Sequence, residues 1–390
     1  MLTALVNAHV YTPEEEIAAA TVVLEDSSIA AVGERLPPPA GAKVVDLTGL
    51  NLLAGFIDLH VHGGGGFSLM TEDAEEIRSY ARWVVSKGVT SFLATLTAAS
   101  RPQMERWLAT VSMLGEKVDG GAHPLGAHLE GPFLNPKHKG ALLPAALRPP
   151  DRAELLGYVR AAGGRLKVIV VAPELPGAAE VIGIAREQGL VVSMGHTDAT
   201  YEEAREAISR GVTQATHCFN AMRPFHHRDP GCLGAILASP QVTAELIGDG
   251  VHVHPGAMAL LLRAKGPVRT ILVTDGVAPT GLGSGTYSFG GRPVVVKDGV
   301  FILPDGTISG SAATMDQMVR NLVELGLVSL QEASRMASLN AAIVLGLDRR
   351  KGRVAPGFDA DLVALGESLE VAMTFVGGQL VYSRPQGQGR

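Results

Sequence analysis

Eight short apolar runs recur along the middle of this chain, and amphipathic segments alternate with them. The runs are residues 53–62, 89–97, 125–130, 166–173, 190–196, 212–217, 242–247 and 270–275. The amphipathic segments include residues 73–87, 102–114, 177–188, 201–209 and 255–264. Strands that alternate with helices are typical of βαβ units. Eight of them predict an α/β fold of the (β/α)8 or TIM-like barrel type, whose active sites lie at the carboxyl ends of the strands.

The two ends of the chain have a different pattern. Apolar and polar residues alternate there as in hairpin strands, in residues 3–12, 21–33, 359–365 and 371–383. We expect residues 1–53 and 355–390 to form one small β-sandwich domain beside a barrel of residues 54–354. An insertion near 287–308 also predicts β-hairpins, with turns at residues 297–299 and 304–306.

Composition narrows the class of protein. With 46% hydrophobic and 18% charged residues, 390 residues can bury a large core. The formal net charge of -6 and the lack of a dense Lys/Arg block argue against nucleic acid as a partner and favour a small molecule. No long apolar run or basic leader is present, so we expect a soluble cytoplasmic protein without a membrane partner. Cys218 and Cys232 suit a reducing compartment and are expected to be buried thiols.

Histidines and acidic residues lie near the ends of the predicted strands. They are His60, His62, Glu130, His196, His217 and Asp275, with His252 close behind the seventh run. Residues two apart on a strand point to the same side, so His60 and His62 can bind one ion together. Imidazole and carboxylate ligands suit Zn²⁺, Fe²⁺ or a similar divalent ion, which lowers the pKa of a bound water to about 7. The pattern predicts a metal site at the mouth of the barrel. The run Gly63–Gly66 is expected to let the backbone pass close to that metal or to a ligand.

Six segments resemble a known family. GFIDLHVHG, HLEGPF, GHTDA, THCFNAM, DGVHVHP and VTDGVAPTG are together similar to the N-acetylglucosamine-6-phosphate deacetylases of the amidohydrolase superfamily, and the resemblance spans nearly the whole chain. The HxH pair is shared by many amidohydrolases, whereas HLEGPF, HxFNAM and PFHHRDPG are more specific to this family. The resemblance implies a metal-dependent barrel enzyme that hydrolyses the acetamide of N-acetyl-D-glucosamine 6-phosphate to D-glucosamine 6-phosphate and acetate, in amino-sugar catabolism and recycling.

The resemblance also implies roles for the metal candidates. Glu130, with His196 and His217, would hold one ion, and His60 and His62 would hold a second, which gives one or two ions per subunit. Asp275 would be the catalytic acid/base beside the metal. It would take a proton from the attacking water and return it to the departing amine, because an amide hydrolyses slowly when its amine leaves unprotonated. A purely metal-ligating role is the alternative for Asp275.

Further positions match the substrate contacts of the family. They are Ala141, Leu142, Asn220, Ala221, His226, His227, Arg228, Asp249, His252, Ala313, Thr314 and Met315. Arg228 and the backbone N–H groups of Asn220 and Ala221 would bind phosphate. In some relatives the segment around His226 reaches a neighbouring subunit, which implies a homodimer. Many relatives carry a histidine where Leu142 stands, so that contact is absent here or supplied from elsewhere.

Other interpretations remain open from the sequence. The same chemistry could act on N-acetylgalactosamine 6-phosphate or on another amide or cyclic imide, although Glu130 stands where many imidases carry a carboxylated lysine. A catalytically silent protein that binds a metal or a sugar phosphate is a non-enzyme alternative, against which Asp275 argues. Arg228 could instead pair with Asp229. We expect structural roles for His123 and His138, and for His254 either such a role or support of His252.

Overall fold

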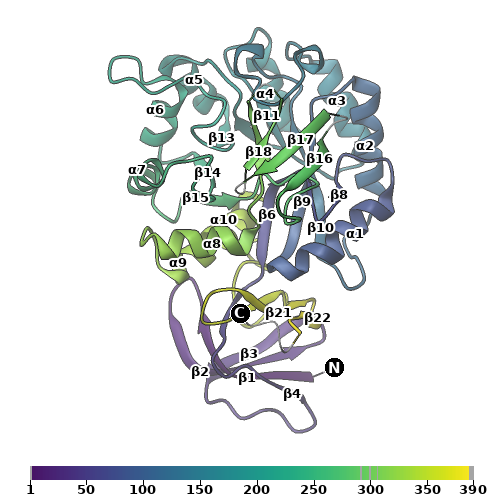
Figure 1. Cartoon of the computed structure of the whole chain (residues 1–390), viewed down its shortest axis with the longest axis vertical. Coiled ribbons are helices and arrows are strands. Elements are labelled where there is room, and N and C mark those ends of the chain that lie inside the picture. Colours follow the sequence, from purple (N-terminus) through teal and green to yellow (C-terminus); the bar gives the residue numbers. More distant parts are fainter. Residues whose placement is uncertain (1, 290–291, 298–299, 305, 386–390) are drawn as a thin grey trace.

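The computed structural model describes residues 2–289, 292–297, 300–304 and 306–385. A barrel of strands and helices occupies one end of the molecule (Figure 1). A sheet built from both ends of the chain lies below it in the same view. Among the described residues, no helix has the length and apolarity needed to cross a membrane.

The barrel wall is a parallel sheet of eight strands, with neighbours in chain order. Its strands are β6 (Phe56–Val61), β9 (Val89–Thr97), β10 (His123–Glu130), β11 (Leu166–Val171), β12 (Val191–Met194), β13 (Val212–Ala215), β14 (Thr243–Ile247) and β15 (Thr270–Val273). The first and last strands meet where Val61 bridges Gly276. There the Asp275 N–H donates to the His60 carbonyl oxygen at 2.8 Å. The predicted (β/α)8 fold is confirmed.

Helices cover the outside of the barrel (Figure 1). They are α1 (Ala74–Val84), α2 (Arg101–Met113), α3 (Arg152–Ala161), α4 (Ala178–Glu187), α5 (Tyr201–Arg210), α6 (Gly231–Ala238), α7 (Pro255–Lys265), α8 (Met315–Glu324), α9 (Leu330–Ala337) and α10 (Leu339–Val344), with short 3-10 turns η1 (Val85–Lys87), η2 (Pro136–His138) and η3 (Pro144–Ala146). In α1, Asp73 caps the first turn and the buried residues Ile77, Tyr80, Ala81 and Val84 recur at helical spacing. That apolar face packs into the main core of the molecule.

The ends of the chain form one further eight-stranded sheet. Its strands are β1 (Leu2–Tyr11), β2 (Glu16–Glu25), β3 (Ser28–Glu34), β4 (Lys43–Asp46), β5 (Asn51–Ala54), β20 (Leu362–Leu365), β21 (Val371–Val376) and β22 (Gln379–Ser383). The carboxyl-terminal strand β20 pairs with the amino-terminal strand β5. Leu5 and Leu24 from one end and Leu362 and Phe375 from the other share an apolar core separate from that of the barrel.

The predicted first strand, residues 53–62, is two strands in the structure. Gly55 separates β5 from β6, and its N–H donates to the Asp361 carbonyl oxygen at 2.8 Å. A Cβ atom at this position would lie 2.2 Å from the Thr90 Cγ2 atom. Glycine therefore allows the chain to pass tightly from the terminal sheet into the barrel.

Two of the four glycines in the run Gly63–Gly66 pack against a tryptophan ring. Gly63 and Gly64 form β7 (Gly63–Gly64), which pairs with β8 (Phe67–Ser68). A Cβ atom on Gly64 or Gly65 would lie 2.4 Å from the ring of Trp83. Gly64 and Gly65 therefore make room for this indole, a contact that the sequence did not indicate.

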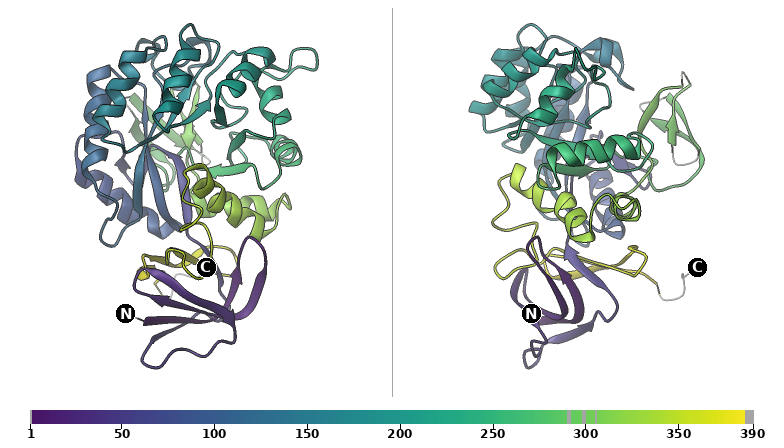
Figure 2. Two further views of the ribbon diagram at one scale, coloured as in Figure 1. Left: turned by 180° about the vertical axis from the view of Figure 1, so that it is seen from behind. Right: turned by 90° about the vertical axis from the view of Figure 1, so that its left-hand side faces the viewer.

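A four-stranded insertion follows the last barrel strand. It comprises β16 (Gly285–Phe289), β17 (Arg292–Lys297), β18 (Val300–Ile302) and β19 (Ile308–Ser311), paired antiparallel in that order. Residues 298–299 and 305 of the two predicted turns lie outside the described residues. Ser311 bridges Gly276, which ties the insertion to the mouth of the barrel. The right-hand view in Figure 2 shows the green insertion standing out from one side of the barrel.

Candidate active site

Three of the predicted site residues lie two positions beyond the end of a barrel strand. His196 follows β12, His217 follows β13 and Asp275 follows β15, and their φ angles are 47°, 28° and 49°. Positive φ is unfavourable for such residues and persists only where the surroundings enforce it. The same backbone conformation therefore recurs at the ends of three strands, where it brings side chains together over the barrel.

One group of side chains gathers on Glu130 at the end of β10. Glu130 Oε1 lies 3.0 Å from His196 Nε2 and 3.0 Å from His217 Nε2. The two histidine nitrogens are 3.1 Å apart. Nitrogen lone pairs this close repel each other unless a cation or a proton lies between them. The three buried side chains offer ligand atoms within 4.8 Å of one another, which fits a divalent ion.

A second group adjoins the first. His62 Nε2 lies 3.3 Å from Asp275 Oδ1, and His60 Nε2 lies 3.6 Å from the same oxygen. The Glu130 carboxylate reaches this group too, with Oε2 3.3 Å from His62 Nε2 and Oε1 3.5 Å from His60 Nε2. Glu130 therefore stands between two sets of ligand atoms, and the donors suit two neighbouring ions as well as one.

The other ring nitrogens of two of these histidines are held by the surrounding chain. His62 Nδ1 lies 3.2 Å from the Thr95 carbonyl oxygen, and His196 Nδ1 lies 2.8 Å from the His138 carbonyl oxygen. A carbonyl oxygen only accepts, so each Nδ1 carries the hydrogen. In the neutral ring each Nε2 then has its lone pair facing the centre of the site, as a metal ligand requires.

The histidines and carboxylates of this centre shift one another's pKa values. Burial would lower the pKa of His62, but hydrogen bonds to Asp275 and Glu130 raise it to about 9. Burial would raise the pKa of Asp275, but the charge of His60 and the hydrogen bond from His62 lower it to about 2. The pKa of Glu130 is likewise lowered, against burial, by the neighbouring histidines. Protons and metal ions therefore compete for the same histidine nitrogens.

A cavity of about 200 Å³ opens onto this centre. Five of the predicted substrate residues line it, namely Ala141, Leu142, Asn220, Ala221 and His252. His62, Glu130 and Asp275 contribute the metal side of the lining, and Val277 contributes an apolar part of the wall. The predicted metal and substrate residues thus meet around one cavity.

His252 is held by Asp249. Its Nδ1 lies 2.6 Å from Asp249 Oδ2, which also accepts a hydrogen bond from Ser311 at 2.7 Å. The buried His252 Nε2 has no hydrogen-bond partner among the described residues. Burial would lower the pKa of His252, but the hydrogen bond and charge of Asp249 raise it above 6.5. Asp249 therefore favours the protonated form of the His252 ring at the cavity wall.

The predicted segment Ala313–Met315 lies around a neighbouring cavity of about 470 Å³, which Asp249, Ala313 and Thr314 help to line. Thr314 caps α8, and Met315 is buried. Val251 lines both cavities. This segment is therefore close to the active-site cavity without forming its wall.

Within a single chain, the predicted phosphate-binding groups do not all face the active-site cavity. Arg228 is exposed and lies outside the lining of the active-site cavity, with its Nη1 2.8 Å from His227 Nε2. Asp229 pairs with Arg223 at 2.8 Å, so the proposed ion pair between Arg228 and Asp229 is replaced by a different one. The Asn220 N–H already donates to the His217 carbonyl oxygen at 3.0 Å and is not available to phosphate in this conformation.

His226 and His227 are exposed on the same loop, and their ring centroids lie 4.3 Å apart with the ring planes tilted by 46°. Like Arg228, both lie outside the cavity lining. Of the remaining histidines, His254 accepts from the Gly256 N–H and caps α7, which is a structural role. His138 Nε2 contacts Asp198 at 3.0 Å while its backbone carbonyl holds His196.

Sequence reasoning missed two residues beside the metal centre. Glu245 in β14 is fully buried, with Oε2 3.0 Å from His60 Nδ1. His128 in β10 is also fully buried and packs edge-on against His60 at 4.6 Å. A carboxylate inside the apolar run 242–247 was a usable signal, because a buried charge requires partners. His128 stands two residues before Glu130 and so on the same side of the strand.

Known proteins are similar to this chain in sequence and in fold. The model of the amidohydrolase family matches residues 51–381. An N-acetylglucosamine-6-phosphate deacetylase of Lysinibacillus sphaericus is 36% identical over 359 residues, which cover 92% of each chain. An N-acetylgalactosamine-6-phosphate deacetylase of Escherichia coli O157:H7 is 36% identical over 357 residues, covering 92% of this chain and 93% of that one.

A solved structure is similar over almost the whole length. It is that of a variant N-acetyl-D-glucosamine-6-phosphate deacetylase from Mycobacterium smegmatis in complex with N-acetyl-D-glucosamine-6-phosphate, with a TM-score of 0.91 and 34% identity. The match covers 98% of this chain and 100% of that one. The chain belongs to the amidohydrolase family and, within it, to the group of N-acetylglucosamine-6-phosphate deacetylases.

Proposed function

We propose that this protein hydrolyses the acetamide of N-acetyl-D-glucosamine 6-phosphate to D-glucosamine 6-phosphate and acetate, in amino-sugar catabolism and cell-wall recycling in the cytoplasm. The observation that carries the proposal is the position of Glu130, which stands between two histidine groups beside Asp275 on one cavity wall. Similarity to deacetylases that act on phosphorylated amino sugars supports the choice of substrate.

The residues present fit a divalent metal. The buried Nε2 of His60 has no hydrogen-bond partner in the described structure, and nitrogen and oxygen ligands converge around it. Glu130, His196 and His217 would hold one ion, and His60 and His62, together with Asp275, would hold a second. Zn²⁺ or Fe²⁺ suits these donors. When bound, the metal supplies a Lewis acid that polarises the acetyl carbonyl and makes water more acidic.

Asp275 is the group that moves protons. Its lowered pKa keeps the carboxylate ionised at neutral pH, so an Asp275 oxygen can accept a proton from the attacking water. The same carboxyl group then donates that proton to the amine nitrogen as the C–N bond breaks. Asp275 also lines the cavity, so its carboxylate faces the space that a substrate would enter.

Other groups would bind the sugar and the phosphate of the substrate. Protonated His252 offers its Nε2–H to an oxygen of the sugar or the phosphate, while Asp249 fixes the ring. The loop of His226, His227 and Arg228 is exposed and lies outside the active-site cavity of its own chain. This position supports a role in the active site of a second subunit. We therefore propose a homodimer in which this loop contributes to the neighbouring phosphate site.

The test is acetate release from N-acetylglucosamine 6-phosphate by metal-loaded and chelator-stripped protein. N-acetylgalactosamine 6-phosphate and unphosphorylated N-acetylglucosamine are run beside it. Metal-dependent release from the first substrate, well above the other two, supports reaction and selectivity together. Preference for the galactose epimer would change the substrate, and no release from any of the three with metal bound would overturn the proposal and make Leu142 the first residue to examine.

A further inference from the structure

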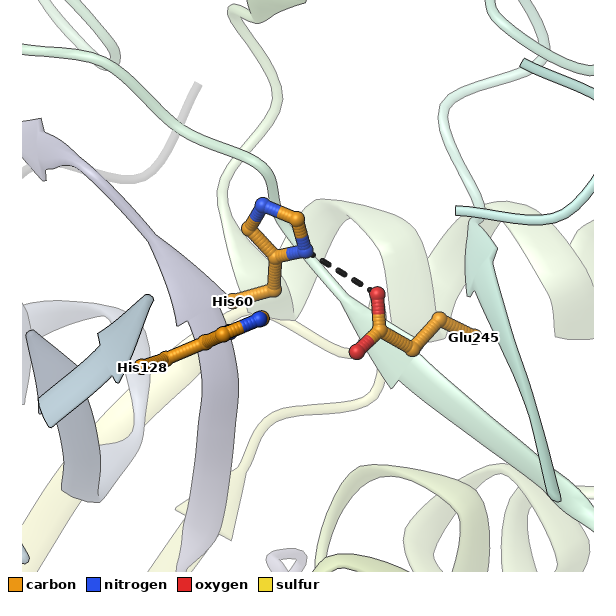
Figure 3. A group of neighbouring side chains, drawn as sticks. All are labelled: His60, His128 and Glu245. Atoms are coloured by element: carbon orange, nitrogen blue, oxygen red, sulfur yellow. Dashed lines mark hydrogen bonds and ion pairs between the residues drawn. The ribbon is translucent and has the colours of Figure 1, made fainter. Parts of the chain in front are cut away.

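Glu245 is a carboxylate buried in the barrel wall behind the metal centre. It belongs to β14, whose five residues are all buried, and neither Glu245 nor His60 has exposed side-chain surface. Figure 3 shows the Glu245 carboxylate facing the His60 ring, with His128 alongside. None of these three residues lines the active-site cavity, so Glu245 does not contact substrate.

Three N–H groups converge on this carboxylate. His60 Nδ1 lies 3.0 Å from Oε2, and the backbone N–H of His217 donates to the same oxygen at 3.0 Å. The Gln214 side-chain amide donates to Oε1. One carboxylate therefore contacts His60, which belongs to the group with Asp275, and His217, which belongs to the group around Glu130.

These contacts fix the orientation of His60. With its Nδ1–H donated to Glu245, the ring leaves the Nε2 lone pair facing Glu130 and Asp275. His128 restricts the ring from the other side, because it packs edge-on at 4.6 Å and its own Nδ1 is held 2.9 Å from the Leu59 carbonyl oxygen. The contact to the His217 N–H also supports a backbone with φ of 28°.

We propose that Glu245 is a positioning residue that fixes His60 and His217 relative to each other and thereby sets the affinity of the centre for metal. The inference rests on the proposed metal site but not on the proposed substrate. The spacing of His60, His128 and Glu245 also admits an ion among these three. We favour positioning because the carboxylate already accepts from three N–H groups and the cluster lies outside the cavity.

Two conservative variants separate position from charge. Glu245→Gln keeps the length of the side chain, and its Oε1 still accepts from His60 and His217. The amide of Gln214 can turn so that its Oε1, which has no partner in the described structure, accepts from the new NH₂ group. Glu245→Asp keeps the charge but withdraws the carboxylate by one methylene, so the contact to His60 is lost. Loss of contacts behind metal ligands typically costs about 10–100-fold in metal affinity.

The experiment uses the full chain, stripped of metal, and titrates Zn²⁺ against a competing chelator and Co²⁺ by its visible absorption. We expect Glu245→Asp to weaken affinity by about 10–100-fold and to change the Co²⁺ spectrum, and Glu245→Gln to stay within about threefold. The matched control is Glu154→Gln, which alters a buried carboxylate of α3 bound to Arg148 and Tyr158. It should leave metal binding unchanged.

The opposite order of metal affinities would overturn the proposal. If Glu245→Gln weakened metal binding and Glu245→Asp did not, the negative charge of Glu245 would be the cause and not its position. Loss of one whole equivalent of metal in both variants would instead make Glu245 a ligand. Should Glu245→Asp not fold, Glu245→Ala takes its place, since it also removes the contact to His60 and should show the same loss of about 10–100-fold. A tenfold loss of affinity in Glu245→Gln, or unchanged affinity in Glu245→Ala, refutes positioning. Metal binding is measured without substrate, so failure of the deacetylase proposal would be recognised separately.

Discussion

The Asp275 carboxylate lies 3.3 Å from the His62 imidazole at the mouth of the barrel. These two residues come from opposite ends of the barrel strand order and meet only because β6 and β15 close the barrel. Asp275 retains some side-chain exposure and lines the cavity, whereas His62 is nearly buried. The carboxylate can thus contact a metal ligand and a substrate from one position.

Replacing Asp275 with asparagine should abolish turnover, because an amide cannot accept and return the proton. Proton transfer by a positioned side chain contributes about 10²–10⁴-fold to rate, so kcat should fall by roughly that factor. The ion held by Glu130, His196 and His217 should remain, since these ligands are untouched, so elemental analysis should still find at least one metal ion per chain. Activity equal to the parent would sink the assigned role.

The activity should depend on the charge of His252. Its pKa is raised above 6.5, against burial, by Asp249, so the imidazolium donor is present at low pH and is lost as pH rises through the raised pKa. Above that pH the neutral ring keeps its hydrogen on Nδ1 and Nε2 becomes an acceptor. We expect kcat/KM to fall over this range, and His252→Gln to lose that part of the profile. An unchanged profile in the variant would exclude His252 as the donor.

Arg228→Ala should raise KM for the phosphorylated sugar far more than for the unphosphorylated one. A hydrogen bond to a charged group is worth about 1.5–3 kcal/mol, which corresponds to roughly 10–100-fold. Arg210→Ala is a matched control, since Arg210 is an exposed arginine of α5 paired with Glu206. It changes net charge equally and should leave both KM values unchanged. An equal effect of Arg228→Ala on both substrates would remove the phosphate role.

Gly55→Ala should destabilise the protein. The added methyl group would lie 2.3 Å from Thr90 Oγ1 of β9, within the buried junction between β5 and β6, and overpacking of this kind costs about 1–3 kcal/mol. Gly183→Ala in α4 is the control, since its Cβ meets nothing within 4 Å and alanine favours a helix by about 1 kcal/mol. In urea unfolding, the free energy of unfolding should fall for Gly55→Ala and rise for Gly183→Ala. A Gly55→Ala variant as stable as the parent would contradict this account of the junction.

The sequence by itself determined the barrel and its metal-site candidates. Periodicity reports which face of each strand is buried, and the order of helices and strands restricts the connections between them. The carboxyl ends of barrel strands gather at one face, so His60, Glu130 and His217 could be expected to meet there although they are far apart in the chain. The interruption at Gly55 escaped this reasoning, because an apolar run continues through it.

Only the tertiary structure decided which partner each polar group finds. Nothing local to Glu245 indicates His60, because their contact depends on closure of the barrel across 185 positions of the chain. The location of Arg228 outside its own cavity and the capping role of His254 were decided in the same way. Local pattern fixes the side of an element on which a residue lies, whereas hydrogen-bond partners depend on distances of a few tenths of an ångström that packing of the whole chain sets.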